Sequence, residues 1–264
     1  ITTKDGFHKW FRKSLAHFQD HSFNDKLIDS VIDQLVACFA ITVENGQYKA
    51  TNIGKIASIF YYSPFDVSDL RRNFKDIFDN CRENDEHAVA LALGNVDSFR
   101  WGFVSRDEKE QMATFSAMIK AKYGDKYYTD SVIKHAYAYY NIIMGKYNVE
   151  AFAGLQAGLK VDSDRMMQVL KAIDSMNSRW GKQEYLNTLQ KRIMYGVPEH
   201  LLNLCQIPEV AKVRAEKLWK IGVKNVDDFA AMDSQSIAKA LKVTVKTANE
   251  MLKEANLLKI RASL

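Results

Sequence analysis

The feature that most constrains the fold is the spacing of apolar residues, which changes once within the first 64 residues. Between residues 24 and 39 the apolar positions recur at steps of three and four, the period of one buried helix face. These positions are Leu27, Ile28, Val31, Ile32, Leu35, Val36 and Phe39. Asn24 is suited to cap this helix. The β-prone runs 41–43 and 48–50 then flank Glu-Asn-Gly-Gln, which predicts a tight hairpin.

A helix near residues 5–17 precedes these elements, and another begins at about residue 52. Helix, helix, hairpin, helix is the order of a winged-helix domain, which we place at residues 1–64. The alternative is any other small α+β unit that contains a hairpin. Pro64 marks the boundary, because proline cannot continue the preceding helix.

From residue 65 to residue 197 the spacing predicts helices, so the fold class is mainly α. We expect helices near residues 67–80, 85–93, 108–120 and 130–144. The first should bury one face that carries Leu70, Phe74, Ile77 and Phe78. A cluster of tyrosines is expected to pack in or at the rim of the core, the alternative being stacking on bases. These are Tyr137, Tyr139, Tyr140 and Tyr147.

A long helix is predicted to follow a turn near residues 158–163, with Asp162 or Ser163 as its cap. It should run to about residue 189, with a break expected at Gly181. Its apolar stripe consists of Met166, Val169, Leu170, Ile173, Met176 and Trp180. Another face carries polar and basic residues without an acidic one: Gln168, Lys171, Ser175 and Arg179. This face is either a contact for nucleic acid or an ordinary solvated surface.

Composition and charge limit the function classes. The 264 residues are 47% hydrophobic, which is enough for real cores, and the net charge of +5 permits an anionic partner without requiring one. Three cysteines without C-x-x-C spacing favour a reduced intracellular compartment, cytoplasm or nucleoid. No apolar run reaches the roughly 20 residues of a membrane span. Because the chain starts at Ile1, we expect a fragment or a trimmed product.

No catalytic site is predicted. Gly54-Lys55 does not fit the phosphate-binding loop G-x-x-x-x-G-K-[ST], because the first glycine would fall on Lys49 and Ile56 replaces the Ser or Thr. No Ser-His-Asp or Cys-His arrangement can be argued. His17 and His21 have the spacing of two metal ligands on a helix, but no third ligand is evident, so no metal is expected.

Two segments carry a family resemblance. Residues 50–64, A-T-N-I-G-K-I-A-S-I-F-Y-Y-S-P, resemble the end of the winged-helix domain in Ski-like superfamily 2 helicases, roughly A-T-x-x-G-x-x-A-S-x-Y-Y-x-x-P. Residues 191–230 begin K-R-I-M-Y-G-V-P-E-H-L-L-N-L-C-Q-I-P-E-V-A-K-V-R-A. They are similar to the join between the ratchet and helix-hairpin-helix domains of the same helicases. The two segments stand in the order that the family has.

The resemblance implies the nucleic-acid-binding C-terminal portion of an ATP-dependent DNA helicase of the DNA repair type. It implies a winged-helix domain at 1–64, a helical ratchet domain at 65–197 and a helix-hairpin-helix domain at 198–264. It also implies single-stranded or branched DNA as the partner and no membrane contact. The motor domains would lie N-terminal to Ile1 and hold ATP and Mg²⁺, so we expect no cofactor in this chain.

In the DNA repair members, a basic and an aromatic residue of the ratchet helix touch the bases. The aromatic position falls near Ile173 or Asp174 here, so the candidate contact is the polar face of Gln168, Lys171, Ser175 and Arg179. In the last domain the candidate phosphate contacts are Lys212, Arg214, Lys217 and Lys246. A helix-hairpin-helix normally exposes backbone N–H groups to phosphate at two hairpin glycines. Glu209 and Ala211 replace those glycines, so we expect weaker phosphate binding.

Two rival functions stay open. One is a protein-interaction scaffold in which DNA binding has decayed, which the replaced glycines and the missing aromatic residue would explain. The other is a helicase relative that acts on RNA. A salt titration of single-strand binding separates the first rival from the main interpretation, and matched DNA and RNA oligomers separate the second.

Overall fold

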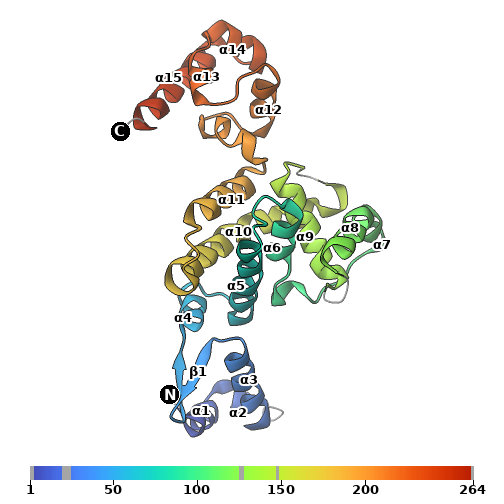
Figure 1. Cartoon of the computed structure of the whole chain (residues 1–264), viewed down its shortest axis with the longest axis vertical. Coiled ribbons are helices and arrows are strands. Elements are labelled where there is room, and N and C mark those ends of the chain that lie inside the picture. The colour runs from blue at the N-terminus through green and yellow to red at the C-terminus, as the bar shows by residue number, and fades with distance from the viewer. Residues whose placement is uncertain (1–2, 20–24, 125–127, 147–148, 263–264) are drawn as a thin grey trace. The chain divides into compact units, whose positions relative to one another are not determined.

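The computed structural model describes residues 3–19, 25–124, 128–146 and 149–262. These residues are mainly helical, with one two-stranded sheet (Figure 1). The chain forms two compact units. Unit 1 comprises Ile1–Tyr137 and Asp164–Leu186, and unit 2 comprises Ala138–Ser163 and Asn187–Leu264. The predicted fold class, mainly α, is confirmed, whereas the domain boundaries at 64/65 and 197/198 stay a prediction.

Unit 1 begins with helices and a hairpin. They are α1 (Lys4–Phe11), α2 (Leu15–Gln19), α3 (Asp25–Ala37), β1 (Ile41–Glu44) and β2 (Gln47–Ala50). The two strands are antiparallel, with Ile41 opposite Ala50. Asn45 and Gly46 have φ angles of 51° and 73°, as a two-residue hairpin turn requires, so the predicted hairpin is confirmed.

The two predicted N-terminal helices differ from expectation. The helix predicted over residues 5–17 is divided, because Ser14 accepts a hydrogen bond from the backbone N–H of His17 and starts α2. In α3 the predicted apolar stripe is only partly used. Ile32 is buried, whereas Leu27 and Val31 are exposed, as is Phe39 just beyond the helix. The cap predicted at Asn24 lies outside the described residues.

Helix α4 (Asn52–Ile59) is anchored to the hairpin by the first residues of the 50–64 motif. Thr51 caps the helix by accepting from the backbone N–H of Gly54 at 3.2 Å. The Thr51 hydroxyl also donates to the carbonyl of Phe39, and the Thr51 N–H donates to the carbonyl of Ala40. A Cβ at position 54 would collide with the Ala40 carbonyl oxygen, so only glycine fits there. The Thr-x-x-Gly spacing therefore has a packing role.

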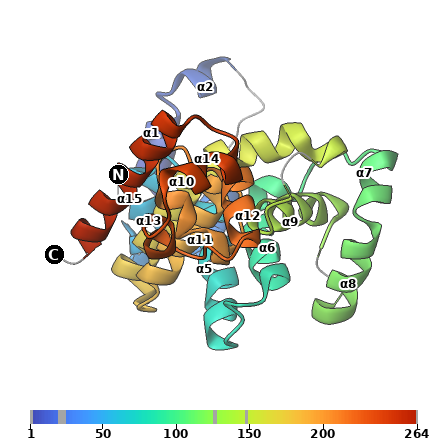
Figure 2. The ribbon, with the colours of Figure 1, turned by 90° about the horizontal axis from the view of Figure 1, so that it is seen from above.

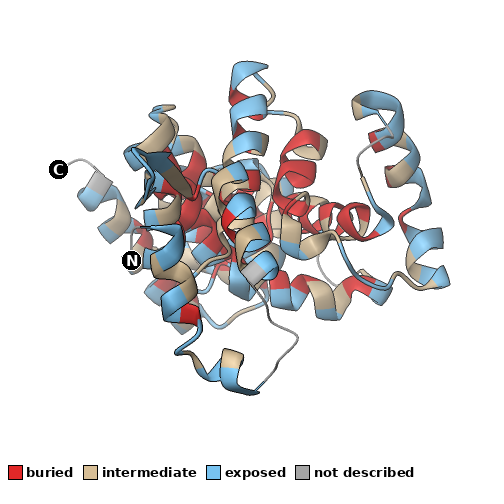
Figure 3. Ribbon diagram, turned by 90° about the horizontal axis from the view of Figure 1, so that it is seen from below, coloured by how far each residue is buried: buried red, intermediate tan, exposed pale blue. Residues whose placement is uncertain are grey.

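The core of unit 1 is built on the helices that follow α4. They are α5 (Pro64–Asp79), α6 (Glu86–Gly94), η1 (Asp97–Phe99), α7 (Arg106–Gln111), α8 (Ala113–Tyr123) and α9 (Asp130–Ile143), the last of which continues into unit 2. The face of α5 predicted to be buried is buried: Leu70, Phe74, Ile77 and Phe78. Gly94 lets α6 approach α9 closely, since a Cβ there would lie 2.6 Å from the backbone nitrogen of Ala136. Figure 3 shows the buried residues in red along the inner faces of the helices.

Two details of this region also differ from the sequence predictions or refine them. The helix predicted over 108–120 is two helices, because the backbone at Met112 (φ −92°, ψ 3°) interrupts it. A capping box between Ser105 and Glu108 starts the first of them at Arg106. Of the tyrosines, Tyr139 is fully buried and Tyr137 packs edge-on against Phe115, which confirms packing for these two. Tyr147 lies outside the described residues.

Helix α10 (Ala153–Ile173) is longer at its start than predicted. The turn expected near 158–163 is wrong, and neither Asp162 nor Ser163 is a cap. The buried Ser163 hydroxyl donates instead to the carbonyl of Leu159 one turn earlier, so the helix continues through it. In the predicted apolar stripe, the four residues within α10 are buried and Met176 is 41% exposed.

A break then follows, as predicted. The π-helical turn η3 (Asp174–Ser178) ends α10, and α11 (Gln183–Tyr195) begins after residues 179–182, which include Gly181 with φ 70°. The remaining elements of unit 2 are η2 (Glu150–Phe152), η4 (Glu199–Leu201), η5 (Leu204–Gln206), α12 (Lys212–Lys220), α13 (Val226–Ala230), α14 (Ser234–Leu241) and α15 (Val245–Ala262).

The C-terminal helices of unit 2 share one core. Helices α13 and α14 both pack against α15 (Figure 2). Leu218, Phe229, Ile237 and Met251 are buried between them. Two connections contain a non-glycine residue in the left-handed region, Glu209 before α12 and Lys242 before α15.

Candidate nucleic-acid interface

The polar face predicted from spacing is only partly continuous. Gln168 and Lys171 lie three residues apart on the last turns of α10, and Ser175 lies in the π-helical turn. Arg179 follows that turn and adopts a left-handed backbone (φ 50°, ψ 47°), with its N–H bonded to the carbonyl of Asp174. The structure therefore places Gln168 and Lys171 on one helix face and does not extend that face as an α-helix to Arg179. Gln168, Ser175 and Arg179 are exposed, and Lys171 is half-buried.

Asp174 holds the turn that presents Arg179. Its carboxylate is 2% exposed and accepts from the backbone N–H groups of Gly181 and Lys182, each at 2.9 Å. It also accepts from the side-chain amide of Gln183 at 2.9 Å. A carboxylate in this position caps the N-terminus of α11. Asp174, which stands near the family's aromatic contact position, is thus a buried residue that stabilises the turn through hydrogen bonds.

Trp180 does not take the role of that aromatic residue. Its ring packs on Phe78, with the ring centroids 5.1 Å apart. The Lys182 ammonium group lies over the same Phe78 ring, 5.5 Å from its centroid. Lys182 donates to Glu83 at 2.7 Å, and this hydrogen bond lowers the pKa of the Glu83 carboxyl. Trp180 and Lys182 thus tie the turn to α5 and to the segment that follows it.

The expectation of a face without acidic residues is wrong at its N-terminal end. Asp164 accepts a hydrogen bond from Gln168 at 2.7 Å, so a carboxylate borders the polar residues. A basic residue was missed beside it. Arg165 lies three residues before Gln168, and its guanidinium lies 5.4 Å from the ring centroid of Tyr62. The three-residue step from Arg165 to Gln168 was the signal in the sequence. Next to Tyr62, the Tyr61 side chain is 90% exposed.

In unit 2 three of the four predicted phosphate contacts lie together. Lys212, Arg214 and Lys217 line a cavity of about 680 Å³ whose rim also includes Glu209. Arg214 donates to both the backbone carbonyl (2.5 Å) and the carboxylate (3.1 Å) of Glu209. Lys246 is exposed in the first turn of α15 and does not line this cavity. The fourth predicted contact is therefore separate from the other three.

The hairpin before α12 keeps the backbone shape that glycine adopts most readily. Glu209 has φ 69°, and Ala211 is the N-cap of α12 without a side-chain hydrogen bond. The Glu209 carboxylate forms an ion pair with the guanidinium of Arg214 at 3.1 Å. The hairpin therefore presents a carboxylate and a neutralised arginine at the tip.

Other chemistry is not assembled among the described residues. No group of three or more His, Cys, Asp or Glu within them could hold a metal ion, and His21 lies outside them. Within the same part of the chain, no helix combines the length and the apolarity that crossing a membrane would require.

Comparison with known proteins gives a consistent relationship. No profile of a protein family matches the chain. ATP-dependent DNA helicase Hel308 of Methanococcus vannielii is 24% identical over 216 residues, which is 71% of this chain and 27% of that protein. Hel308 of Thermoplasma volcanium is 32% identical over 74 residues, or 28% of this chain and 11% of the relative. Hel308 of Aeropyrum pernix is 31% identical over 67 residues, or 25% and 9%.

The chain spans about a quarter or less of the length of these curated relatives. The alignments concern proteins that bear one name in three organisms, and one of them extends over most of this sequence. This agrees with the two segments, 50–64 and 191–230, that resemble one helicase family. The chain is related to the C-terminal region of the Ski-like superfamily 2 helicases.

Proposed function

We propose that this chain is the nucleic-acid-binding C-terminal portion of an ATP-dependent superfamily 2 DNA helicase, and that it guides single-stranded DNA for motor domains of the parent protein. The observation that carries the proposal is the relationship to Hel308 DNA helicases across 71% of the chain. ATP and Mg²⁺ belong to those motor domains. In this assignment residues 1–64 are a winged-helix domain, residues 65–197 a ratchet domain and residues 198–264 a helix-hairpin-helix domain.

The surface around the end of α10 supports strand contact. Lys171 and Arg179 supply cationic groups that pair with phosphates, and Gln168 and Ser175 supply groups that hydrogen-bond to sugars or bases. Arg179 is held at a fixed turn by the contacts of Asp174, so its position does not depend on a flexible loop. A backbone that is already ordered loses little conformational entropy when the side chain it carries binds.

The hairpin before α12 supports a weaker contribution from unit 2. Lys212, Arg214 and Lys217 face one cavity, which suits a phosphate backbone. The Glu209 carboxylate repels the same phosphate and pairs with Arg214. We therefore assign the main strand contact to Lys171 and Arg179, and a diffuse electrostatic contact to Lys212, Arg214, Lys217 and Lys246.

Fluorescence anisotropy with a labelled single-stranded DNA oligomer, repeated at several salt concentrations, tests the proposal. We expect weak binding whose logarithm falls linearly with the logarithm of salt concentration. A matched RNA oligomer is the second arm. Clear preference for RNA would replace the DNA assignment by an RNA-acting relative. Binding that does not respond to salt, or no binding at all, would favour the protein-interaction scaffold.

A further inference from the structure

Unit 1 contains a cavity that the proposed strand contact does not use. It has a volume of about 700 Å³ and lies among α5, α6 and the end of α8. Arg72, Arg82, Arg100 and Lys122 line it together with Tyr123 and Tyr128. Ile77 and Leu91, both buried, contribute apolar lining. Small-molecule sites in proteins have volumes of about 300–1,000 Å³ and combine an apolar lining with a few convergent polar groups.

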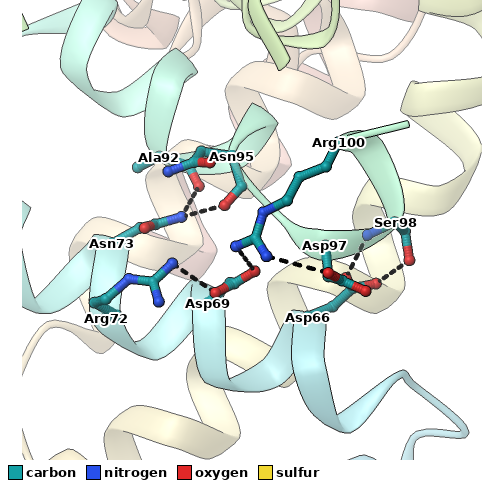
Figure 4. Close-up of polar contacts among 9 residues, drawn as sticks. All are labelled: Asp66, Asp69, Arg72, Asn73, Ala92, Asn95, Asp97, Ser98 and Arg100. Atoms are coloured by element: carbon teal, nitrogen blue, oxygen red, sulfur yellow. Dashed lines mark hydrogen bonds and ion pairs between the residues drawn. The ribbon is translucent and has the colours of Figure 1, made fainter. Parts of the chain in front are cut away.

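The cationic groups are fixed from behind by acids, most of which do not line the cavity. Asp69, whose side chain is 7% exposed, accepts from Arg72 and from Arg100, each at 2.5 Å (Figure 4). One carboxylate thus serves two guanidinium groups. Arg100 also donates to Asp97 at 3.1 Å, and neither Asp69 nor Asp97 lines the cavity. The shared carboxylate sets the position of both arginines. A guanidinium has five N–H donors, and these contacts use one of them in Arg72 and two in Arg100.

A second group of residues that line the cavity is arranged in the same way around a tyrosine. Lys122 and the Tyr123 hydroxyl both donate to Asp85 at 2.5 Å, and Asp85 does not line the cavity either. The Arg82 guanidinium lies 5.8 Å from the Tyr123 ring centroid and 3.2 Å from Asp76. The four cations that line the cavity are balanced by four carboxylates, those of Asp69, Asp76, Asp85 and Asp97. Among the described residues only Asp76 of these acids belongs to the lining, so the lining presents mainly N–H donors to the cavity.

The scaffold beneath these side chains is rigid. The Asn73 side-chain amide donates to the carbonyls of Ala92 and Asn95, which fixes the end of α6 against α5 (Figure 4). The buried Asp66 accepts from the backbone N–H and the hydroxyl of Ser98, which fixes η1. The segment that carries Arg100 is therefore held at two points, and the site exists before any ligand arrives.

We propose that this cavity binds a nucleotide, with its phosphate paired to Arg72, Arg100 and Lys122 and its base packed beside Tyr128 on the apolar lining. Guanidinium groups match phosphate oxygens in geometry and charge. A tyrosine ring and aliphatic side chains provide a surface for a base. The volume is far larger than inorganic phosphate needs, which favours a ligand with a ring. A free nucleotide and one nucleotide of a strand share this chemistry.

Titration of the whole chain with thymidine 5′-monophosphate tests the inference. Isothermal calorimetry gives the affinity, and ¹⁵N-tyrosine labelling reports on Tyr123 and Tyr128. We expect saturable binding that shifts both tyrosine signals. Thymidine and inorganic phosphate should each bind at least about tenfold more weakly than the monophosphate, because each lacks one half of the contacts. Absence of saturable binding, or equal binding of inorganic phosphate, would overturn the assignment.

Variants decide whether the site is this cavity. Arg72→Gln and Lys122→Gln change side chains that are more than half exposed, so folding should survive. Each should weaken nucleotide binding about tenfold. Lys75→Gln is the matched control, because Lys75 lies on α5 three residues from Arg72 and does not line the cavity. A decrease in affinity in Lys75→Gln equal to that in Arg72→Gln would refute the cavity as the site.

A single-stranded dT oligomer separates the two sources of the nucleotide. If the oligomer shifts the same two tyrosines, the ligand is a nucleotide within a strand; if only the monophosphate does, it is a free nucleotide. Both results support a nucleotide site. The inference does not rest on the proposed strand contact, because Lys171 and Arg179 do not line the cavity. Strand binding that survives while monophosphate binding is absent would refute this inference alone.

Discussion

The buried carboxylate of Asp174 accepts a hydrogen bond from the backbone N–H of Lys182, eight residues later, at 2.9 Å. Between these two residues the chain leaves a π-helical turn, passes through Arg179 and Gly181 with positive φ, and starts α11. One side chain therefore determines the path of the whole break. Short π-helical segments of this kind are frequent at functional sites.

Asp174→Asn should destabilise the chain by about 2–4 kcal/mol. The substitution keeps the shape but replaces one acceptor oxygen by a donor that faces buried N–H groups. Urea unfolding monitored by circular dichroism measures the change. Asp164→Asn is the control, because Asp164 is exposed and its replacement should cost less than about 0.5 kcal/mol. Equal stability of the two variants would contradict the role given to Asp174.

Lys171→Gln combined with Arg179→Gly should weaken single-strand binding without destabilising the chain. Glycine adopts the left-handed backbone of position 179 without strain, so it removes the charge and keeps the turn. The slope of the salt titration should become shallower by about 0.7 for each phosphate of a single strand that the variant no longer neutralises. The measurement is fluorescence anisotropy at several salt concentrations, together with a melting curve.

The comparison for that double variant is Lys212→Ala combined with Arg214→Ala in the hairpin before α12. It also removes two cations, but from the cavity that contains the Glu209 carboxylate. If it weakens strand binding more than the α10 pair does, the main contact surface lies in unit 2 and our assignment is wrong.

Glu209→Gly should tighten strand binding and stabilise the chain. The substitution releases Arg214 from its ion pair, removes a carboxylate that repels phosphate, and relieves a left-handed backbone that costs a non-glycine residue about 1–2 kcal/mol. Lys242→Gly relieves the same backbone conformation but removes a cation. Both variants should melt at a higher temperature, and only Glu209→Gly should bind DNA more tightly. Tighter binding by both would mean that backbone relief alone is responsible.

Gly94→Ala should destabilise the chain by about 3 kcal/mol or more. The added methyl group would lie 2.6 Å from the backbone nitrogen of Ala136, and backbone cannot move aside as a flexible side chain can. Gly154→Ala in α10 meets no atom within 4 Å and should stabilise the helix by up to about 1 kcal/mol. Chemical unfolding of both variants measures the difference. A mild effect at position 94 would show that α6 and α9 separate easily.

Tyr123 should titrate well above the pH at which an ordinary tyrosine loses its proton. Burial and the hydrogen bond to Asp85 raise the pKa of Tyr123 to about 12 from 10.0. Because the folded state favours the neutral phenol, this contribution to stability is complete below about pH 10 and is lost as the pH rises towards 12. The absorbance at 295 nm of the wild type minus that of Tyr123→Phe should rise near pH 12. In urea the same difference should rise near pH 10. A rise near pH 10 in the folded chain would contradict the burial of Tyr123.

The sequence predicted those elements whose side chains repeat one pattern. The hairpin followed from Asn45 and Gly46, which tolerate positive φ, and the buried face of α5 followed from a clean three- and four-residue period. Both signals depend on residues near one another in the chain. The break at Gly181 was also predicted, although the π-helical turn before it was not, because no residue type specifies that turn.

The errors came from residues with two local options. Ser163 can cap a helix or bond one turn back within it, and only tertiary burial decided for the second. Asp174 stood close to the position expected for an aromatic contact, and the structure made it an internal acceptor for residues up to nine positions later. The cavity beside Arg72 and Arg100 draws on residues from 72 to 128, which no local pattern connects.

Thr51 and Gly54 belong to the most recognisable motif of the chain, and both have a structural role where α4 packs against residues 39 and 40, just before the hairpin. The motif therefore reports ancestry more directly than activity. Substitutions there will lower the amount of folded protein, and in a cellular assay they will look like damage to the binding function. The abundance of folded protein must therefore be measured together with the phenotype of such variants. A lower abundance and a damaged binding surface would reduce growth in the same way.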